Sequence, residues 1–301
     1  MSKVLISVVI PAYNYASTLP RAVRSVLAQL VEGTTELLVI DDGSTDSTPQ
    51  VLEQLMAEHP GRFEVIRKPN GGLSSVRNLG IKEARGQFLI FLDADDEMAE
   101  GALGAVLQHI AAHPQSRLII GGHWSVFEDG RRSLHIPKPL PSTPVERVRG
   151  YLIDKSVALS NGACAMHREV FGPGLYPEHL RNAEDIPVFA QVLAQFPCTV
   201  LDAPLAIIYK HADSMRHDLR QSLASGTRVV DEVFAAERMP VQLQTLRQPF
   251  LAQRCLSLFR DCYGAGDHVN AKAFYAQAIR ADWRSLARWS YTRKAIRLMF
   301  K

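Results

Sequence analysis

The chain has 301 residues, of which 47% are hydrophobic, and its 34 Lys and Arg nearly balance its 31 Asp and Glu for a formal net charge of +3. This composition is typical of a globular protein with a sizeable core, either one large domain or a domain with an appendage. It argues against a dedicated nucleic-acid binder, which has a strongly basic face, and no stretch approaches the roughly 20 apolar residues of a membrane span. Four widely spaced cysteines indicate free thiols in a reducing cytoplasm.

Short apolar runs alternate with helical patterns in the first 120 residues. Strands are predicted at residues 4–10, 36–40, 63–67, 88–92 and 117–120. Helices are predicted to begin near Ser17-Thr18, Thr48-Pro49, Ser74 and Glu100. This alternation predicts an α/β fold with a doubly wound, mostly parallel sheet and helices on both faces.

The pattern changes in the second half of the chain. Four prolines within residues 136–144 predict an extended loop. From about residue 222 the composition is helical, and helices are predicted at residues 250–263 and 269–281, separated by Gly264-Ala265-Gly266-Asp267. We therefore expect a helical appendage after the α/β part.

An acidic motif, Asp93-Ala94-Asp95-Asp96, directly follows the predicted strand 88–92. The carboxyl ends of strands are where open α/β sheets bind their ligands. Carboxylates on a tight turn at that place suit a hard divalent cation, and such a cation suits a diphosphate. The alternative is an acidic turn that caps the next helix, which requires one Asp rather than three.

Three further motifs accompany the acidic one. Residues 7–14 (SVVIPAYN) end the first strand, residues 39–46 (VIDDGSTD) end the second, and Arg77-Asn78-Leu79-Gly80 lies in the third helix. In this order and spacing, the four motifs resemble those of the family 2 glycosyltransferases, whose catalytic domain has the GT-A fold. The resemblance covers residues 3–214, about two thirds of the chain. It implies a catalytic domain over 1–220, with a nucleotide-sugar half at about 1–125 and an acceptor half at about 126–220, before a helical region over 221–301.

The resemblance implies a donor site for a nucleotide sugar. The residues expected to line it are Pro11, Ala12, Tyr13, Asn14, Asp41, Asp42, Arg77, Asp93, Ala94 and Asp95. The first four would line the base and ribose, the Asp41-Asp42 pair would accept a hydrogen bond from a uracil-type base, and Arg77 would reach the base or phosphates. Alternatively, Asp41-Asp42-Gly43-Ser44 is only a turn and Arg77 only a solvated helix residue. Asn78 and Gly80 are expected to support packing.

The family's Asp-x-Asp motif, matched by Asp93-Ala94-Asp95, implies a Mn²⁺ or Mg²⁺ cofactor. Asp95 is then a metal ligand, Asp93 contacts the metal, a metal-bound water or the ribose, and Asp96 supports the loop. His211, in Tyr209-Lys210-His211, is the implied third metal-site ligand. Its spacing is one residue short of the family pattern, and His217 is a rival.

A catalytic base is implied by Asn182-Ala183-Glu184-Asp185, which resembles the family's Glu-Asp motif. Asp185 is expected to deprotonate the acceptor hydroxyl, with Glu184 beside it for acceptor contact or positioning. The alternative is a helix N-terminus with acidic residues in its first turn, and both can hold at once. Residues 160–165 (SNGACA) would form the acceptor-side floor, although their small side chains equally suit plain packing.

The implied activity is inverting transfer of a sugar, from a UDP-sugar by default, to a hydroxyl of a glycan or lipid-linked glycan. The implied setting is the assembly of bacterial surface polysaccharide or lipopolysaccharide in the cytoplasm. A sugar nucleotidyltransferase or a nicotinamide dehydrogenase would carry a Gly-rich phosphate loop after the first strand, and none is present. A catalytically inactive scaffold with this fold is the remaining alternative, which the intact Asp93, Asp95 and Asp185 disfavour.

The last 20 residues, 282–301, hold four aromatic and six basic side chains, among them Trp283 and Trp289. They predict a membrane-surface helix that reaches a lipid-linked acceptor at the inner face of the membrane. The alternative is a docked terminal helix, because Arg284 and Arg288 fall on a different side of a helical wheel from the later basic residues.

Overall fold

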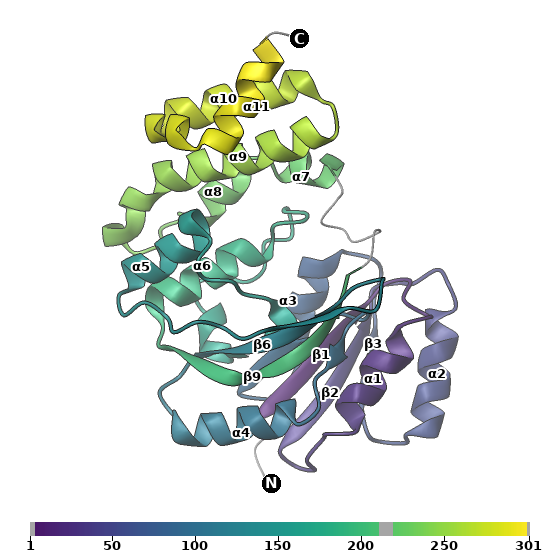
Figure 1. The fold of residues 1–301 in the computed structure, drawn as a ribbon. Coiled ribbons are helices and arrows are strands. Elements are labelled where there is room, and N and C mark those ends of the chain that lie inside the picture. The colour runs from purple at the N-terminus through teal and green to yellow at the C-terminus, as the bar shows by residue number, and fades with distance from the viewer. Residues whose placement is uncertain (1–3, 211–218, 300–301) are drawn as a thin grey trace. The chain divides into compact units, whose positions relative to one another are not determined.

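The computed structural model describes residues 4–210 and 219–299. The chain forms two compact units (Figure 1). The first unit comprises Met1–Leu140, Val157–Glu178 and Phe196–Ala212, and the second comprises Pro141–Ser156, His179–Gln195 and Asp213–Lys301. Each unit has its own hydrophobic core. The predicted division near residue 220 stays a prediction.

One sheet organises the first unit. Within the described residues its strands are β1 (Ile6–Ala12), β2 (Thr35–Asp41), β3 (Glu64–Arg67), β4 (Phe88–Phe91), β5 (Glu97–Met98), β6 (Leu118–Val126), β7 (Arg132–His135), β8 (Cys164–His167) and β9 (Cys198–Tyr209). Their order is β3-β2-β1-β4-β8-β6-β9-β5, with β7 beside β6. The strands β3, β2, β1 and β4 are parallel neighbours, so the loops after β1, β2 and β4 leave the same edge of the sheet.

Helices cover both faces of this parallel part. They are α1 (Leu19–Leu27), α2 (Thr48–Glu58), α3 (Leu73–Glu83) and α4 (Ala102–Ala112). Val8 and Ile10 of β1 share a core with α1 and α4, whereas Val9 faces α3, where a Cβ on Gly80 would lie 2.7 Å from it. Every residue of β1 and β4 is buried, as expected for central parallel strands. The predicted α/β fold is confirmed, and Gly80 packs a helix against the sheet.

The other half of the sheet is mixed. β8 is antiparallel to both β4 and β6, and β7 and β5 add antiparallel pairs with β6 and β9. The long strands β6 and β9 are parallel to each other. Two short 3₁₀ turns, η2 (Asn161–Ala163) and η3 (Arg168–Phe171), flank β8.

The second unit is helical. Its elements are α5 (Pro144–Arg149), the π-helical turn η1 (Gly150–Asp154), α6 (Asp185–Gln195), α7 (Leu219–Ser225), α8 (Arg228–Val233), η5 (Val241–Leu246), α9 (Arg247–Gly264), α10 (His268–Ala281), η6 (Trp283–Ala287) and α11 (Trp289–Met299). Phe259 of α9, Tyr275 of α10 and Leu298 of α11 meet in one buried cluster. Across the described residues, no helix is both long and apolar enough to cross a membrane.

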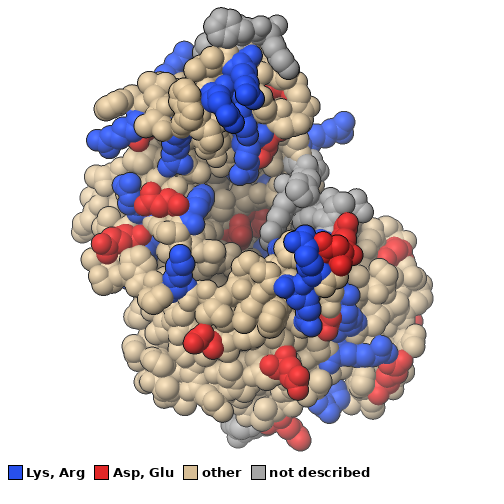
Figure 2. Space-filling model, viewed as in Figure 1, with Lys and Arg blue, Asp and Glu red and all other residues tan. Residues whose placement is uncertain are grey.

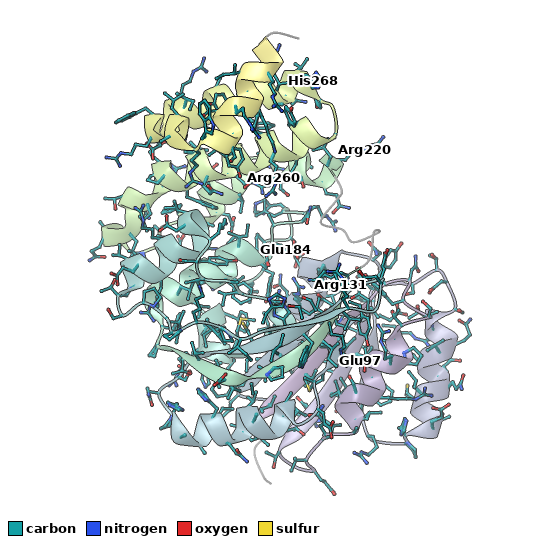
Figure 3. All side chains as sticks on the ribbon, in the orientation of Figure 1. Glu97, Arg131, Glu184, Arg220, Arg260 and His268 are labelled. Carbon is teal, nitrogen blue, oxygen red and sulfur yellow. The ribbon has the colours of Figure 1, made fainter. Side chains whose placement is uncertain are left out.

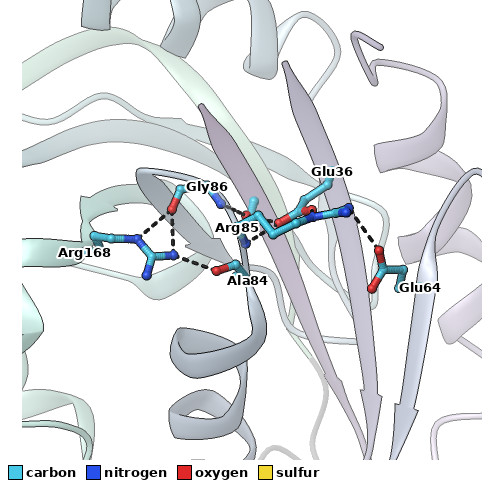
Figure 4. A network of polar contacts seen from close by, with 7 residues as sticks. Glu36, Glu64, Ala84, Arg85, Gly86 and Arg168 are labelled. Carbon is cyan, nitrogen blue, oxygen red and sulfur yellow. Dashed lines mark hydrogen bonds and ion pairs between the residues drawn. The ribbon is translucent and has the colours of Figure 1, made fainter. Parts of the chain in front are cut away.

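A carboxylate at the start of β2 ties three segments of the first unit together (Figure 4). Glu36 accepts hydrogen bonds from the Ser7 hydroxyl and from the backbone N–H and Nε of Arg85, each at 2.6 Å. The same guanidinium pairs with Glu64 at 2.9 Å. Burial alone would raise the pKa of Glu36, but the bonds from Ser7 and Arg85 outweigh it and hold the pKa below the usual 4.5. The ionised form therefore stabilises the fold.

We expect Glu36→Gln to lower the free energy of unfolding at pH 7 by about 2 kcal/mol, because charge-assisted bonds to Arg85 are lost. The folded pKa of Glu36 lies below its unfolded value, so this stabilisation is present at neutral pH and disappears as pH falls through the folded pKa. Urea unfolding at pH 7 and below pH 4.5 measures both effects. The control is Glu64→Gln, whose side chain is 64% exposed and should contribute little. Equal losses in the two variants at pH 7 would contradict the prediction.

Candidate functional site

The loops after β1 and β2 are joined through one asparagine. The Asn14 side-chain oxygen accepts hydrogen bonds from the backbone N–H groups of Thr45 at 2.8 Å and Asp46 at 3.3 Å, and its own N–H donates to Ser44 Oγ at 2.9 Å. Asn14 has φ +60°, a left-handed conformation that Asn adopts more readily than most residues. Pro11 and Ala12 are buried at the end of β1, and Tyr13 is 43% exposed. The loop thus offers an aromatic ring at the sheet edge.

Asp41 and Asp42, at the end of β2, are both 2% exposed. Asp41 accepts a bond from the Ser44 N–H at 3.0 Å, the turn geometry that the Asp-Gly-Ser sequence favours. Asp42 accepts from Lys68 Nζ at 2.5 Å and from the N–H groups of Gly71 and Gly72 at 2.9 and 2.7 Å. Asp42 therefore anchors the segment that leads into α3, and contact with a base stays a prediction for both residues.

Arg77 of α3 is 3% exposed, so it is not a solvated helix residue. Its Nη2 lies 3.3 Å from Asp93 Oδ1, and its guanidinium lies over the Tyr176 ring at 5.3 Å. Asn78, one residue later, exchanges hydrogen bonds with the backbone of Tyr176 at 2.9 Å in both directions. The third helix therefore orients Asp93 and fixes the 176–178 segment.

The acidic turn after β4 is held from two other elements. Arg21 of α1 donates to the Asp95 carbonyl at 2.5 Å, and its guanidinium lies 3.7 Å from the centre of the Tyr209 ring. The Tyr209 backbone N–H, at the end of β9, donates to Asp96 Oδ1 at 2.9 Å. The Tyr209 hydroxyl donates to Glu97, which also pairs with Arg21 at 3.2 Å (Glu97 is labelled in Figure 3).

The carboxylates of this turn create a strongly negative potential. Burial, and then the charges of Asp93 and Asp95, raise the pKa of Asp96 to about 8. Burial and the three carboxylates also raise the pKa of the Tyr15 phenol, which places Tyr15 beside the turn. A bound cation would relieve this repulsion.

The carboxylate oxygens of this turn suit a hard divalent cation whose coordination shell is completed by a substrate. In the part of the chain that the structure describes, no three His, Cys, Asp or Glu side chains gather into a complete metal cluster. Mg²⁺ commonly takes one or two carboxylates and completes its shell with water and substrate phosphates, which is the set that Asp93 and Asp95 can offer. The predicted ligand His211 and its rival His217 lie outside the described residues.

The predicted base lies in the second unit, at the first residue of α6. Asn182 precedes it with φ +60°, and its amide donates to Ser222 Oγ at 3.1 Å. Glu184 (labelled in Figure 3) is 8% exposed, and its Oε2 accepts from the Ala183 N–H at 3.0 Å. Asp185 is the acidic residue in the first turn of α6, so the predicted helix start is correct. The role of Asp185 as the catalytic base stays a prediction.

Lys155, also in the second unit, was not expected from the sequence. It ends the π-helical turn η1 with φ +57°, and its ammonium donates to the Tyr151 carbonyl at 3.3 Å. The surrounding protein and the charge of Arg254 lower the pKa of Lys155, while Asp185 opposes them. The charges of Arg260 and Arg288 lower it further. Lys155 therefore lies among positive charges, and Asp185 is the carboxylate whose charge opposes them.

The structure thus brings the predicted donor residues together at one sheet edge and adds residues that the motifs did not reveal. Each of these added residues interacts with a segment that is distant in sequence; they are Tyr15, Arg21, Lys68 and Tyr209. The only signal for Tyr209 was its place beside His211. Glu184 and Asp185 belong to the other unit.

An acidic turn after a buried parallel strand places this chain in the class of open α/β proteins that bind ligands at the carboxyl ends of their strands. The profile of the Glycosyl transferase family 2 matches residues 7–172, more than half of the chain. The chain therefore belongs to glycosyl transferase family 2.

Curated relatives match part of the chain. The Minor teichoic acid biosynthesis protein GgaA of Bacillus subtilis is 32% identical over 148 residues, which is 44% of this chain and 33% of that protein. The Uncharacterized glycosyltransferase EpsJ of the same organism is 32% identical over 142 residues, 47% of this chain and 40% of that protein. The chain thus matches only about a third of the length of such relatives.

Solved structures match nearly the whole chain at low identity. S. aureus TarS 1–349, solved in complex with UDP-GlcNAc, has a TM-score of 0.67 at 20% identity, covering 98% of this chain and 89% of that one. The mannosyltransferase PcManGT from Pyrobaculum calidifontis, in complex with GDP-Man and Mn²⁺, has a TM-score of 0.57 at 17% identity, covering 98% and 86%. These likenesses show the GT-A-like fold.

We expect Asp42→Asn to lower the free energy of unfolding by about 2 kcal/mol, because the buried carboxylate has three donors and Lys68 would lose its counter-charge. The matched control is Lys68→Met, which leaves the bonds from Gly71 and Gly72 to Asp42 in place and should cost less. Chemical denaturation of both variants measures the difference. A loss of nucleotide affinity in Asp42→Asn with unchanged stability would instead indicate a direct contact with the base.

Proposed function

We propose that the chain is an inverting glycosyltransferase that moves a sugar from a nucleoside diphosphate sugar, with UDP-sugars favoured, to a hydroxyl of a glycan or lipid-linked glycan. The observation that carries the proposal is the acidic turn 93–96, held at the carboxyl end of β4 beside the joined loops after β1 and β2. A base, a ribose and a diphosphate require an aromatic or amide lining and a negatively charged turn that recruits a cation. This edge supplies both.

In the proposed donor site, Tyr13 and the Asn14 loop bind the base and ribose, and Arg77 holds Asp93 in place. Asp95, with Asp93, would hold Mn²⁺ or Mg²⁺, which supplies Lewis-acid neutralisation of the leaving diphosphate. The Mn²⁺ named for the PcManGT complex supports this cofactor. Tyr209 and Arg21 keep the turn in position, because each contacts its backbone or its Asp96 carboxylate.

In the proposed transfer step, the acceptor hydroxyl attacks the anomeric carbon from the face opposite the diphosphate. The new carbon–oxygen bond forms as the bond to the diphosphate breaks, so the configuration inverts. The Asp185 carboxylate takes the hydroxyl proton, and Glu184 positions the acceptor. The nucleoside diphosphate leaves with the bonding electron pair.

The acceptor chemistry is suggested by the charges around Asp185. Lys155 has no carboxylate within ion-pair distance among the described side chains, and three arginines add positive charge around it. We propose that the acceptor carries a phosphate that contacts Lys155. The name of the relative GgaA, a minor teichoic acid biosynthesis protein, supports a role in bacterial surface polysaccharide assembly.

The experiment that tests the donor site is calorimetric titration of the chain with UDP, GDP and dTDP, each with and without Mn²⁺. Tight, metal-dependent binding of one nucleotide is expected, and it names the base. Binding of none by folded protein would favour an inactive scaffold with this fold.

Asp95→Asn should abolish the gain in nucleotide affinity that Mn²⁺ provides, because one ligand oxygen of the proposed cation site is lost. Asp185→Asn should retain nucleotide affinity and lose transfer by at least about a hundredfold, because the base no longer accepts a proton. Titration and product formation measure the two effects separately. Unchanged Mn²⁺ dependence in Asp95→Asn contradicts the metal assignment, and unchanged turnover in Asp185→Asn contradicts the base.

Lys155→Met should weaken binding of inorganic phosphate by about tenfold, because one charge-assisted contact is removed. The titration is made with UDP and Mn²⁺ saturating, so that the donor site is filled. Lys82→Met is the control, since the Lys82 side chain is 79% exposed on α3 of the other unit. Equal phosphate affinity in all three proteins would exclude Lys155 from an anion site.

A further inference from the structure

Positive charge is concentrated at the end of the chain. Residues 268–301 contain eight Lys or Arg and one acidic residue, Asp282, whereas the remaining residues contain 26 Lys or Arg and 30 Asp or Glu. The chain is therefore slightly acidic apart from this segment. Figure 2 shows the corresponding helices with Lys and Arg side chains spread over them and little acidic surface between.

The structure settles which side of α11 faces outward. Tyr291 packs against the core of the second unit, and Ala295 and Leu298 are buried in it. The opposite side exposes Trp289 at 66% and Ile296 at 42%. Arg293 and Arg297 are exposed on the same side, one and two helical turns after the tryptophan. The outer face of α11 is therefore apolar and basic at once.

The preceding turn η6 also exposes apolar side chains. Trp283 and Leu286 are 71% and 48% exposed, and in a 3₁₀ turn residues three apart lie on the same side. The bend between η6 and α11 is fixed, because the Thr292 hydroxyl donates to the Leu286 carbonyl at 2.8 Å and accepts from Tyr275 at 2.8 Å. The exposed side chains thus project from a braced backbone.

The exposed tryptophans and arginines of η6 and α11 together suit one kind of partner. A single exposed apolar residue is ordinary, but two tryptophans beside several arginines on consecutive turns are not needed for the core behind them. Tryptophan prefers the boundary between water and hydrocarbon, where its ring is apolar and its N–H meets polar headgroups. Arginines around it complement lipid phosphates. The positive charge of the arginines and the exposed tryptophans together favour a negatively charged lipid surface as the partner.

We propose that η6 and the outer face of α11 form a docking surface for an anionic lipid bilayer. The rings of Trp283 and Trp289 enter the headgroup layer, while Arg284, Arg293 and Arg297 contact lipid phosphates. Because the surface belongs to the second unit and has no share in the donor site, its test does not depend on transferase activity.

The test is sedimentation of the full chain with vesicles of phosphatidylcholine alone and of phosphatidylcholine mixed with phosphatidylglycerol. We expect binding to the mixed vesicles only, weakened by added salt because exposed charges are screened. Trp283→Ala with Trp289→Ala, and separately Arg293→Gln with Arg297→Gln, should each reduce vesicle binding at least about tenfold, as expected when interfacial aromatic or basic residues are removed.

Two matched controls should bind like the unaltered chain. Val241→Ala removes an apolar side chain that is 83% exposed, and Arg131→Gln removes a charge whose side chain is 75% exposed. In a Trp124→Phe background, the two remaining tryptophans should shift their emission to shorter wavelength when mixed vesicles are added. Thermal unfolding confirms that each variant is folded.

Three results of the sedimentation experiment would overturn the proposal. The first is that the unaltered chain does not sediment with the mixed vesicles. The second is that it binds equally to both kinds of vesicle. The third is that both double variants bind as well as the control variants. Release from vesicles by double-stranded DNA at an equal phosphate concentration would likewise reject a lipid surface in favour of a general polyanion site. Vesicle binding without nucleotide binding would leave this inference standing while the proposed transferase activity fails.

Discussion

Repulsion among the carboxylates of residues 93–96 is the constraint on which the candidate site depends. Burial, and then the charges of Asp93 and Asp95 on the same turn, raise the pKa of Asp96 to about 8. The fold keeps the turn in place with contacts from α3, α1 and β9, through Arg77, Arg21 and Tyr209. Because these elements come from distant parts of the sequence, the turn has its geometry only when the whole first unit is folded. A cation bound at the turn would relieve this repulsion.

Backbone strain occurs in the loops that carry the predicted site residues. Among the described residues other than glycine, positive φ occurs at Asn14, Lys155 and Asn182. Asn14 shapes the loop after β1, Asn182 precedes Glu184-Asp185, and Lys155 lies in the charged surroundings of Asp185. Each left-handed residue costs conformational energy, more so for Lys than for Asn, and such a cost persists where the surrounding structure enforces it.

The sequence predicts the parallel half of the sheet well and the other half poorly, for a physical reason. β1 and β4 are buried on both faces, so they appear as continuous apolar runs between helical patterns. β5 has two residues and β8 four, and their pairing is decided by neighbours far along the chain. The same limit applies to side chains. The motif predicts that Arg77 belongs to the donor region, but only the packing of α3 shows that it is buried and paired with Asp93. Likewise, a helical wheel alone could not decide which side of the last helix faces the core, whereas Tyr291 and Leu298 decide it in the structure.

Under the proposals above, the two units would bind anionic partners in opposite ways, because the charges at their proposed sites differ in sign. In the proposed mechanism, the carboxylates of the first unit would hold a diphosphate through a cation, and the nucleotide would leave together with that cation after transfer. The second unit presents Lys155 and arginines around the predicted base, and tryptophans with further arginines on η6 and α11. Direct contacts of this kind suit a partner that stays bound during many transfers, such as a phosphate-bearing acceptor or a lipid surface. Under the two proposals, the nucleotide would exchange quickly while the chain remains beside its acceptor, because one interaction depends on an exchangeable ion and the other on many weak, additive charges.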